Sequence, residues 1–160
     1  GDLMIGVGGF INLAQNARCV VFGGTLTAGE LDVTWEHGRT VIRKEGRHRK
    51  FVPKLEQVCY NAALGRARGQ VTLFVTERAV FRVGQDGLEL CEIAPGLDPE
   101  RDVIAHMGFR PGVASDLKTM DARIFRPQRM GLAADIDAKP RAYRSKRVAA
   151  WHAARGEAAR

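Results

Sequence analysis

The sequence holds few of the residues that mark a disulfide-linked, membrane-bound or serine-dependent protein. Its 160 residues include three cysteines and only two serines. No apolar run approaches the roughly 20 residues that a membrane-spanning helix needs. No basic-then-apolar leader opens the chain, and it starts with glycine rather than methionine. We therefore expect a cytoplasmic protein that does not enter a membrane, and a fragment or processed chain.

The cysteines and serines offer no covalent chemistry. Cys19, Cys59 and Cys91 lie about thirty to forty residues apart among apolar neighbours, with no Cys-x-x-Cys pair. This pattern predicts buried free thiols in a reducing compartment. Ser115 and Ser145 stand in polar segments, outside any Gly-x-Ser-x-Gly elbow, so a serine nucleophile is not expected.

Histidine clusters are also absent, which argues against a metal site. None of the four histidines lies three or four residues from another, and none is near a cysteine in sequence. His37 is predicted in a turn and His106 near the end of a helix. We predict no metal.

Two glycine-rich segments have the spacing of nucleotide-binding loops but lack the other residues that such loops need. After Gly6-x-Gly8-Gly9, the dinucleotide fingerprint requires a third glycine where Ile11 stands, and a preceding strand. The segment 24–29 has phosphate-loop glycine spacing, but the positions of the required Lys and Ser/Thr hold Glu30 and Leu31. Both segments are predicted to be turns.

Positive charge is concentrated at the carboxyl end. Residues 121–160 hold ten Lys/Arg against four Asp/Glu, so only +1 of the total net charge of +7 belongs to the first 120 residues. A basic tail can contact nucleic acid or another acidic partner, and it can equally be a solvated helix. We expect a nearly neutral domain over residues 1–126 and a basic, partly helical tail over 127–160.

Hydrophobic periodicity predicts an α/β fold. Cys19–Phe22 is a continuous apolar run, typical of a strand that is buried on both faces. Alternation and turn residues predict further strands, including a three-stranded meander, and three helices. The predicted strands are 31–35, 40–44, 48–52, 58–60, 71–75, 79–83 and 88–93, and the predicted helices are 62–68, 98–107 and 144–158. Glu77 follows a strong strand, and an ion pair with Arg78 is favoured over catalysis there.

Several segments, taken in order, resemble the family I coenzyme A transferases, in particular the acetate/propionate and 3-oxoacid type. The similarity extends over about residues 1–126 and not into the tail. It is carried by segments 6–12, 20–29, 51–52, 75–81, 87–98, 107–111 and 120–125. The resemblance implies an open α/β sheet with a β-hairpin or meander excursion and a carboxyl-terminal helical tail.

The resemblance also implies an activity. Enzymes of this family move coenzyme A between a short-chain acyl-CoA and a free carboxylic acid, through an acyl-glutamyl anhydride and a glutamyl-CoA thioester. Coenzyme A thioester is then a substrate, and no cofactor is held permanently. By resemblance, Gly8 and Gly9 form the oxyanion wall of the acyl site, and Phe10 and Asn12 line the pocket or support it.

The same resemblance places the nucleophilic glutamate upstream of the glycine turn, outside this chain. We therefore expect no catalytic residue here and an inactive isolated chain. It would work with a missing amino-terminal half or a partner subunit, as a homo-oligomer. None of the nine glutamates occupies the position of the nucleophile: Glu30, Glu36, Glu45, Glu56, Glu77, Glu89, Glu92, Glu100 and Glu157.

Two other functions stay open at the level of sequence. The chain could be a non-catalytic interaction domain whose basic tail binds nucleic acid or an acidic partner. It could also be a relative that hydrolyses acyl-CoA, in which water replaces the acceptor carboxylate.

Overall fold

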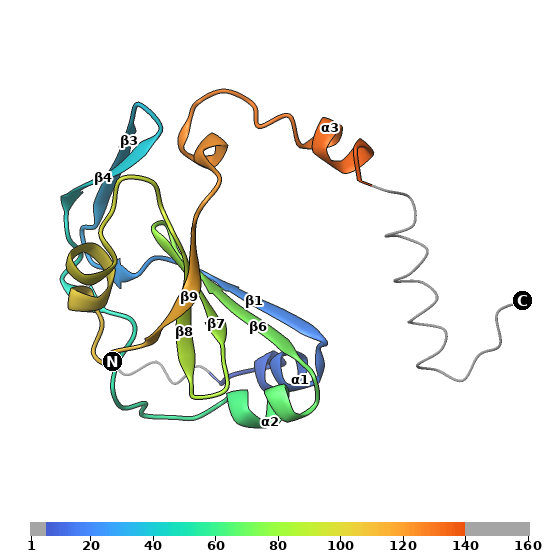
Figure 1. Ribbon diagram of the computed structural model, residues 1–160. Helices are drawn as coiled ribbons and strands as arrows, with labels where there is room; N and C mark the ends of the chain where they lie inside the picture. The colour runs from blue at the N-terminus through green and yellow to red at the C-terminus, as the bar shows by residue number, and fades with distance from the viewer. Residues whose placement is uncertain (1–5, 140–160) are drawn as a thin grey trace, which may run out of the picture. The chain divides into compact units, whose positions relative to one another are not determined.

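A computed structural model describes residues 6–139 of the chain (Figure 1). The chain forms two compact units, Gly1–Pro127 and Gln128–Arg160. Among the described residues, no helix is both long and apolar enough to cross a bilayer.

A five-stranded mixed sheet forms the body of the first unit. Its strand order is β1-β6-β7-β8-β9, with β1 parallel to β6, β8 parallel to β9, and the pairs between them antiparallel. The strands are Cys19–Gly23 (β1), Val71–Val75 (β6), Ala79–Val83 (β7), Leu88–Ile93 (β8) and Gly112–Thr119 (β9). The predicted α/β class is confirmed, and so is the β7–β8 hairpin, whose turn contains Gly87 at φ 128°.

The first predicted strand is confirmed, but its predicted burial is wrong. β1 lies at the edge of the sheet, and Val21 is 57% exposed. The apolar run has the composition of a strand that is covered on both faces of a sheet. Within residues 6–139, however, only β6 pairs with this strand. All three cysteines are free, as predicted, but the predicted burial is wrong: Cys19 on β1 is exposed, and Cys59 and Cys91 are only partly buried.

The predicted three-stranded meander is also wrong in its third strand. β3 (Asp32–Glu36) and β4 (Arg39–Lys44) form the expected hairpin, with His37 at φ 52° in its turn. β5 (His48–Arg49) instead pairs with β2 (Thr27–Ala28). The chain turns away at Glu45 because that carboxylate accepts hydrogen bonds from Thr27 and Arg78, which lie on other parts of the unit.

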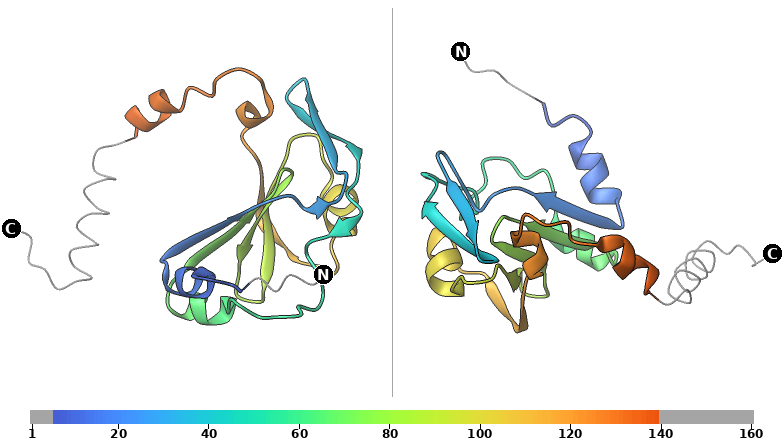
Figure 2. Two further views of the ribbon diagram at one scale, coloured as in Figure 1. Left: turned by 180° about the vertical axis from the view of Figure 1, so that it is seen from behind. Right: turned by 90° about the horizontal axis from the view of Figure 1, so that it is seen from above.

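Two short helices lie side by side near β1 and β6 (Figures 1 and 2). α1 spans Phe10–Asn16 and α2 spans Ala62–Ala67. Gln15 of α1 exchanges two hydrogen bonds with the backbone of Asn61, the residue that caps α2. Gly69 follows α2 at φ 74°, as predicted for a helix end. The strand predicted at 58–60 is wrong, because this segment is irregular.

The helix predicted at 98–107 exists as a wider π turn followed by a 3₁₀ turn. These are η1 (Pro99–Val103) and η2 (Ile104–His106). Asp98 caps the first, accepting a hydrogen bond from the Arg101 N–H at 2.8 Å, and Pro99 takes the first helical position. His106 ends the second turn, as expected.

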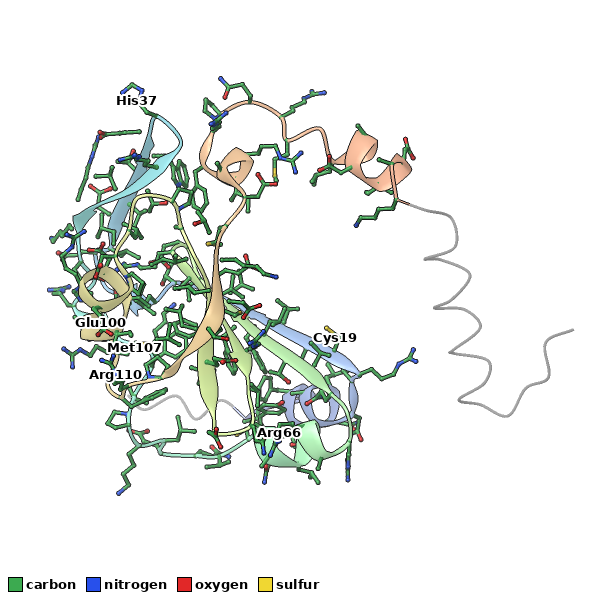
Figure 3. The ribbon with its side chains drawn as sticks, viewed as in Figure 1. Cys19, His37, Arg66, Glu100, Met107 and Arg110 are labelled. Atoms are coloured by element: carbon green, nitrogen blue, oxygen red, sulfur yellow. The ribbon has the colours of Figure 1, made fainter. Side chains whose placement is uncertain are left out.

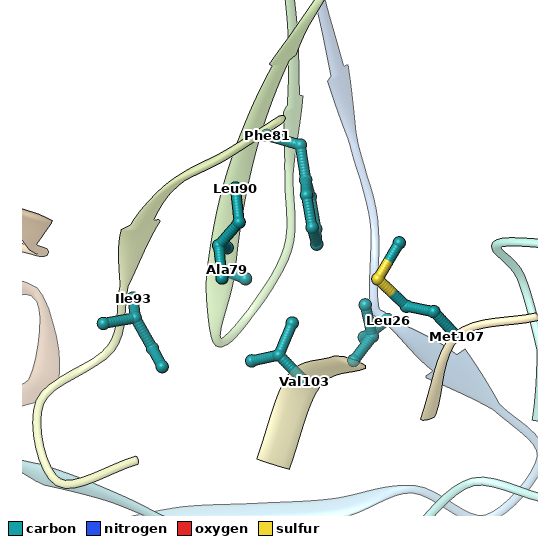
Figure 4. Packing of buried hydrophobic residues seen from close by; sticks show 7 residues of the cluster. All are labelled: Leu26, Ala79, Phe81, Leu90, Ile93, Val103 and Met107. Atoms are coloured by element: carbon teal, nitrogen blue, oxygen red, sulfur yellow. The ribbon is translucent and has the colours of Figure 1, made fainter. Parts of the chain in front are cut away.

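The core lies on both faces of the sheet. One cluster joins β7 and β8 to the η1–η2 segment and to Leu26 (Figure 4). It comprises Leu26, Ala79, Phe81, Leu90, Ile93, Val103 and Met107. On the opposite face, a smaller cluster packs Val80 and Ala94 against Met120 and Phe125, the last from η3 (Ala122–Phe125).

The second unit contains one described helix, α3 (Leu132–Asp137), which the sequence did not predict. Its amino end follows Gly131 at φ 72°. The predicted helix at 144–158 lies outside the described residues.

Candidate functional site

A cavity of about 500 Å³ lies against β1 and β6. One wall comes from the two strands and the residues directly after them, and the other from the segment between β5 and α2. Thr25 and Thr76 lie just past the carboxyl ends of the parallel strands β1 and β6. Ligands of open α/β sheets bind at this end of parallel strands. One end of the cavity is therefore placed where such a fold holds a substrate, and Val83 and Leu88 extend the lining towards the amino end of β6.

The cavity has an apolar lining. Five aromatic rings and several aliphatic side chains form it, and its polar side chains are few. The residues around it are Phe22, Gly23, Gly24, Thr25, Lys50, Phe51, Val52, Leu55, Tyr60, Ala62, Phe74, Val75, Thr76, Val83, Gly87, Leu88 and Phe109. A cavity of this size and lining suits an organic ligand with a sizeable apolar part.

Lys50 brings the single positive charge to the lining. Its Nζ donates a hydrogen bond to Thr25 Oγ1 at 2.9 Å, and Thr25 Oγ1 donates to the Thr27 carbonyl at 2.6 Å. Within residues 6–139, no carboxylate forms an ion pair with Lys50. The ammonium group thus stands at the edge of the cavity with one neutral partner.

The glycine turn predicted to form the acyl site precedes Phe10, whose ring contacts Phe22 of the cavity lining. Gly8 has φ 53°, and Gly9 precedes the first residue of α1. A methyl group added at Gly8 would meet no atom within 4 Å, so the turn faces open space. The role of Gly8 and Gly9 as an oxyanion wall stays a prediction.

Phe10 links the turn to the cavity wall. Its ring centroid lies 5.9 Å from that of Phe22, which stacks on Phe74 at 4.9 Å. Phe22 also meets Tyr60 edge-on at 5.7 Å. Phe10 thus contacts a residue of the cavity wall, and its predicted role in the pocket or in supporting it stays a prediction.

Asn12 lies in α1 and is exposed. Its side-chain and backbone oxygens both accept hydrogen bonds from Asn16 Nδ2, at 2.8 and 2.9 Å. These contacts are within one helix, and Asn12 is not among the residues that line the cavity. Its predicted pocket role gains no support from this geometry.

Glu77 has a structural role, as predicted. Its Oε1 accepts a hydrogen bond from Arg78 Nε at 2.6 Å, and its Oε2 accepts one from the Leu26 N–H at 2.9 Å. Arg78 is fully buried and also pairs with Glu45 at 2.8 Å. Both oxygens of Glu77 thus have partners.

Glu45 completes the ion-pair cluster. Its partial burial raises the pKa, but hydrogen bonds from Arg78 and Thr27 outweigh that effect and hold the pKa at about 2. His106 Nε2 lies 3.6 Å from its Oε2. The carboxylate therefore stays charged at any physiological pH, and the cluster ties the β2–β5 pair to the main sheet.

No group of three or more possible metal ligands occurs among the described residues. Figure 3 shows a histidine and a cysteine that lie far apart: His37 is at the tip of the β3–β4 hairpin, and Cys19 is on β1.

Known proteins with similar sequences are coenzyme A transferases. Over 128 residues, the chain is 40% identical to the acetate CoA-transferase of Escherichia coli K12, covering 80% of the chain. Over 132 residues, it is 39% identical to the caffeate CoA-transferase of Acetobacterium woodii. No protein-family model matches the chain.

The fold agrees with these sequence matches. The acyl-CoA transferase of E. coli O157:H7, solved as a thioester complex with CoA, matches 79% of the chain with a TM-score of 0.75 and 40% identity. Its apoenzyme matches with a TM-score of 0.77. The chain matches a segment of the coenzyme A transferases. The predicted resemblance is thereby confirmed.

The chain is short in comparison with these relatives. It spans 24% of the E. coli acetate CoA-transferase and 25% of the caffeate CoA-transferase. The matched part belongs to the carboxyl-terminal portion of these proteins. About three quarters of each relative thus has no counterpart in these 160 residues.

Sequence reasoning located the glycine turn but missed the cavity beside it. Lys50 and Thr25 are 25 residues apart, and neither belongs to a motif that indicates a ligand. Residues 50–52 belong to the strand predicted at 48–52, and Phe51-Val52 to the family resemblance, but neither pattern indicates a cavity. The position of this segment beside β1 depends on the β2–β5 pairing, which replaced the predicted meander.

Proposed function

We propose that this chain is the carboxyl-terminal part of a CoA-transferase that moves coenzyme A between a short-chain acyl-CoA and a carboxylate. Residues 1–126 belong to the transferase domain, and the basic tail is an addition to it. The observation that supports this most strongly is the combined match, at 40% identity and a TM-score of 0.75, to a transferase solved as a CoA thioester.

The proposed reaction uses a glutamate as a covalent carrier. Its carboxylate attacks the thioester carbonyl of the acyl-CoA, and CoA leaves as a thiolate. The thiolate then attacks the glutamyl carbonyl of the resulting anhydride, which releases the first carboxylate and leaves glutamyl-CoA. The acceptor carboxylate repeats these two steps in reverse order and departs as the new acyl-CoA.

The glycine turn would stabilise the charge that develops in these attacks. Backbone N–H groups stabilise the negative oxygen of a tetrahedral intermediate when they are fixed in advance. Among the described residues, the N–H groups of Gly8 and Gly9 have no backbone acceptor, whereas the N–H of Phe10 donates to the Val7 carbonyl. Gly8 and Gly9 are therefore our candidates for the oxyanion wall.

The nucleophile would come from a part of the enzyme outside these residues. The partly buried Glu45 and Glu77 have their oxygens engaged by Arg78 and by other donors. Neither could approach a thioester without breaking the cluster. The catalytic glutamate is thus proposed to lie upstream, in the remaining polypeptide or in a partner subunit, within a homo-oligomer.

A grafted enzyme tests this function. Residues 1–126 would replace the matched segment of the E. coli acetate CoA-transferase, and acetyl-CoA with propionate would be the substrates. We expect propionyl-CoA to form with the graft and not with the isolated chain. A folded graft without CoA transfer would overturn the proposal.

The glycine turn supplies a matched variant for the same assay. At Gly9, φ is −78° and an added methyl would meet only Leu13 Cδ1, at 4.0 Å, so Gly9→Ala should fold normally. If the turn forms the acyl wall, this methyl should displace the thioester and lower kcat by about a hundredfold. Unchanged kcat in the folded variant would remove Gly9 from the site.

Omitting propionate separates a transferase from a hydrolase. A transferase should hold CoA as a covalent adduct and release little of it when no acceptor acid is present. Steady release of free CoA into water would instead favour the hydrolase.

A further inference from the structure

The cavity beside β1 and β6 is larger than acetate or propionate requires. Its volume of about 500 Å³ falls within the range of sites that hold drug-sized ligands. Acetate or propionate, with one or two apolar carbons, would leave most of it empty. Its walls carry the rings of Phe22, Phe51, Tyr60, Phe74 and Phe109. Such walls favour a flat aromatic or bulky apolar group.

The charge at the cavity points to an anion with a single acidic group. Among the described residues that line the cavity, Lys50 is the one with a charged side chain, and its hydrogen-bond partner is Thr25 rather than a carboxylate. In the same unit, Arg82 and Arg110 each pair with a carboxylate. A ligand carboxylate at Lys50 would supply the missing negative charge.

We infer that this cavity binds the apolar body of an aromatic or bulky carboxylic acid, with the acid's carboxylate on Lys50 Nζ and Thr25 Oγ1. This inference rests on the proposed transferase function and names the class of acid that the enzyme accepts. The Lys50–Thr25 pair stands just past the carboxyl end of β1, and the glycine turn is tied to the same strand through Phe10 and Phe22.

The pantetheine arm of CoA is a poorer match for these walls. It carries two amide groups, and an amide transferred to an apolar environment without a hydrogen bond loses several kcal/mol of solvation. Polar side chains reach the cavity only from Thr25, Lys50, Tyr60 and Thr76. Two of these are already engaged: Tyr60 Oη by Gln70 and Thr72, and Thr76 Oγ1 by the Ala79 backbone.

Calorimetric titration of the 160-residue chain with cinnamate, cinnamamide and acetate tests the inference. We expect cinnamate to bind, cinnamamide to bind about tenfold more weakly because it lacks the charge, and acetate not to bind at millimolar concentration. Lys50→Met should weaken cinnamate about tenfold and leave cinnamamide unchanged. Ala62→Leu, which adds an apolar side chain to the lining and narrows the cavity, should weaken both.

Lys54→Met is the matched control. Lys54 lies four residues further along the same segment, is exposed and does not line the cavity, so its loss should change the Kd less than twofold. Absence of cinnamate binding, or equal effects of Lys50→Met and Lys54→Met, would overturn the inference.

The same titration on the graft separates other outcomes. Cinnamate binding to the isolated chain but not to the folded graft would show that polypeptide fills the cavity, and would also overturn the inference. A graft that transfers CoA to propionate but does not bind cinnamate would leave the proposed function standing and refute the aromatic acid alone. Cinnamate binding without any CoA transfer would refute the function and not the site.

Discussion

The centre of the main sheet and its β1 edge both carry apolar and basic side chains. At the centre these side chains are buried or form ion pairs, whereas at the edge they are exposed or face a cavity. At the centre, β7 and β8 bury Phe81 and Leu90 completely, and the buried Arg78 pairs with two glutamates. At the edge, Val21 is 57% exposed, and Lys50 faces an apolar cavity without an acidic partner.

This difference separates stability from binding. The side chains at the centre stabilise the fold, because they are already buried or paired within the unit. The groups at the β1 edge are available to a substrate or to further polypeptide. Substitutions at the centre should therefore lower stability, and those around the cavity should change binding with little effect on folding.

The largest effect is expected from Arg78→Met. This change would leave Glu45 and Glu77 with no cationic partner in a largely buried setting, and it should lower the free energy of unfolding by about 3–5 kcal/mol. Urea denaturation followed by circular dichroism would measure it. Arg82→Met, which removes an exposed pair with Glu89, is the control and should leave the midpoint nearly unchanged. Equal losses of unfolding free energy in the two variants would contradict the difference between the buried centre and the exposed surface.

Phe81→Ala should come next. Phe81 is completely buried between Leu90 and the η1–η2 segment, so the cavity left behind should cost about 3–4 kcal/mol. Val21→Ala at the exposed edge should cost no more than about 0.5 kcal/mol. Chemical denaturation of the two variants would show whether Val21 at the edge contributes less to the free energy of unfolding than Phe81 at the centre.

Acid should weaken the centre through Glu45. Its pKa is about 2 in the folded chain against an ordinary value of 4.5. A carboxylate whose pKa is lowered by folding stabilises the protein at pH values above its pKa in the unfolded chain. This stabilisation is lost as the pH falls through its pKa in the folded chain. Stability should therefore decline between about pH 4.5 and 2. The slope of unfolding free energy against pH should be smaller in Glu45→Gln, and an unchanged slope would exclude this residue as the cause.

The smallest effect is expected at the cap of η1. Asp98→Ala removes the carboxylate that accepts the Arg101 N–H, and this should cost about 1 kcal/mol. Asp98→Asn keeps an acceptor and should cost less. Thermal unfolding of both variants would distinguish loss of the cap from loss of the charge.

Local patterns predicted much of the sheet. The alternation in 79–83 and 88–93 with a glycine turn identified the β7–β8 hairpin, and Asp98-Pro99 identified the start of η1. β9 was missed because Gly112 opens it and its polar residues follow no clear alternation. The pairing of β5 with β2 depends on the contacts of Glu45 with Thr27 and Arg78, which no local pattern reports.

The candidate site shows the same division. The glycine turn was found because its letters resemble a family motif. The cavity was not, because it arises where β1, β6 and the segment after β5 come together. Lys50 is one of many basic residues in the sequence, and only its position beside an apolar wall distinguishes it.

Locating the covalent CoA adduct tests the central claim most directly, namely that this segment supplies scaffold and substrate contacts but not the nucleophile. The graft would be incubated with acetyl-CoA, digested and analysed by mass spectrometry. The claim predicts CoA on a glutamate outside the grafted residues. An adduct on any glutamate of this chain would contradict it.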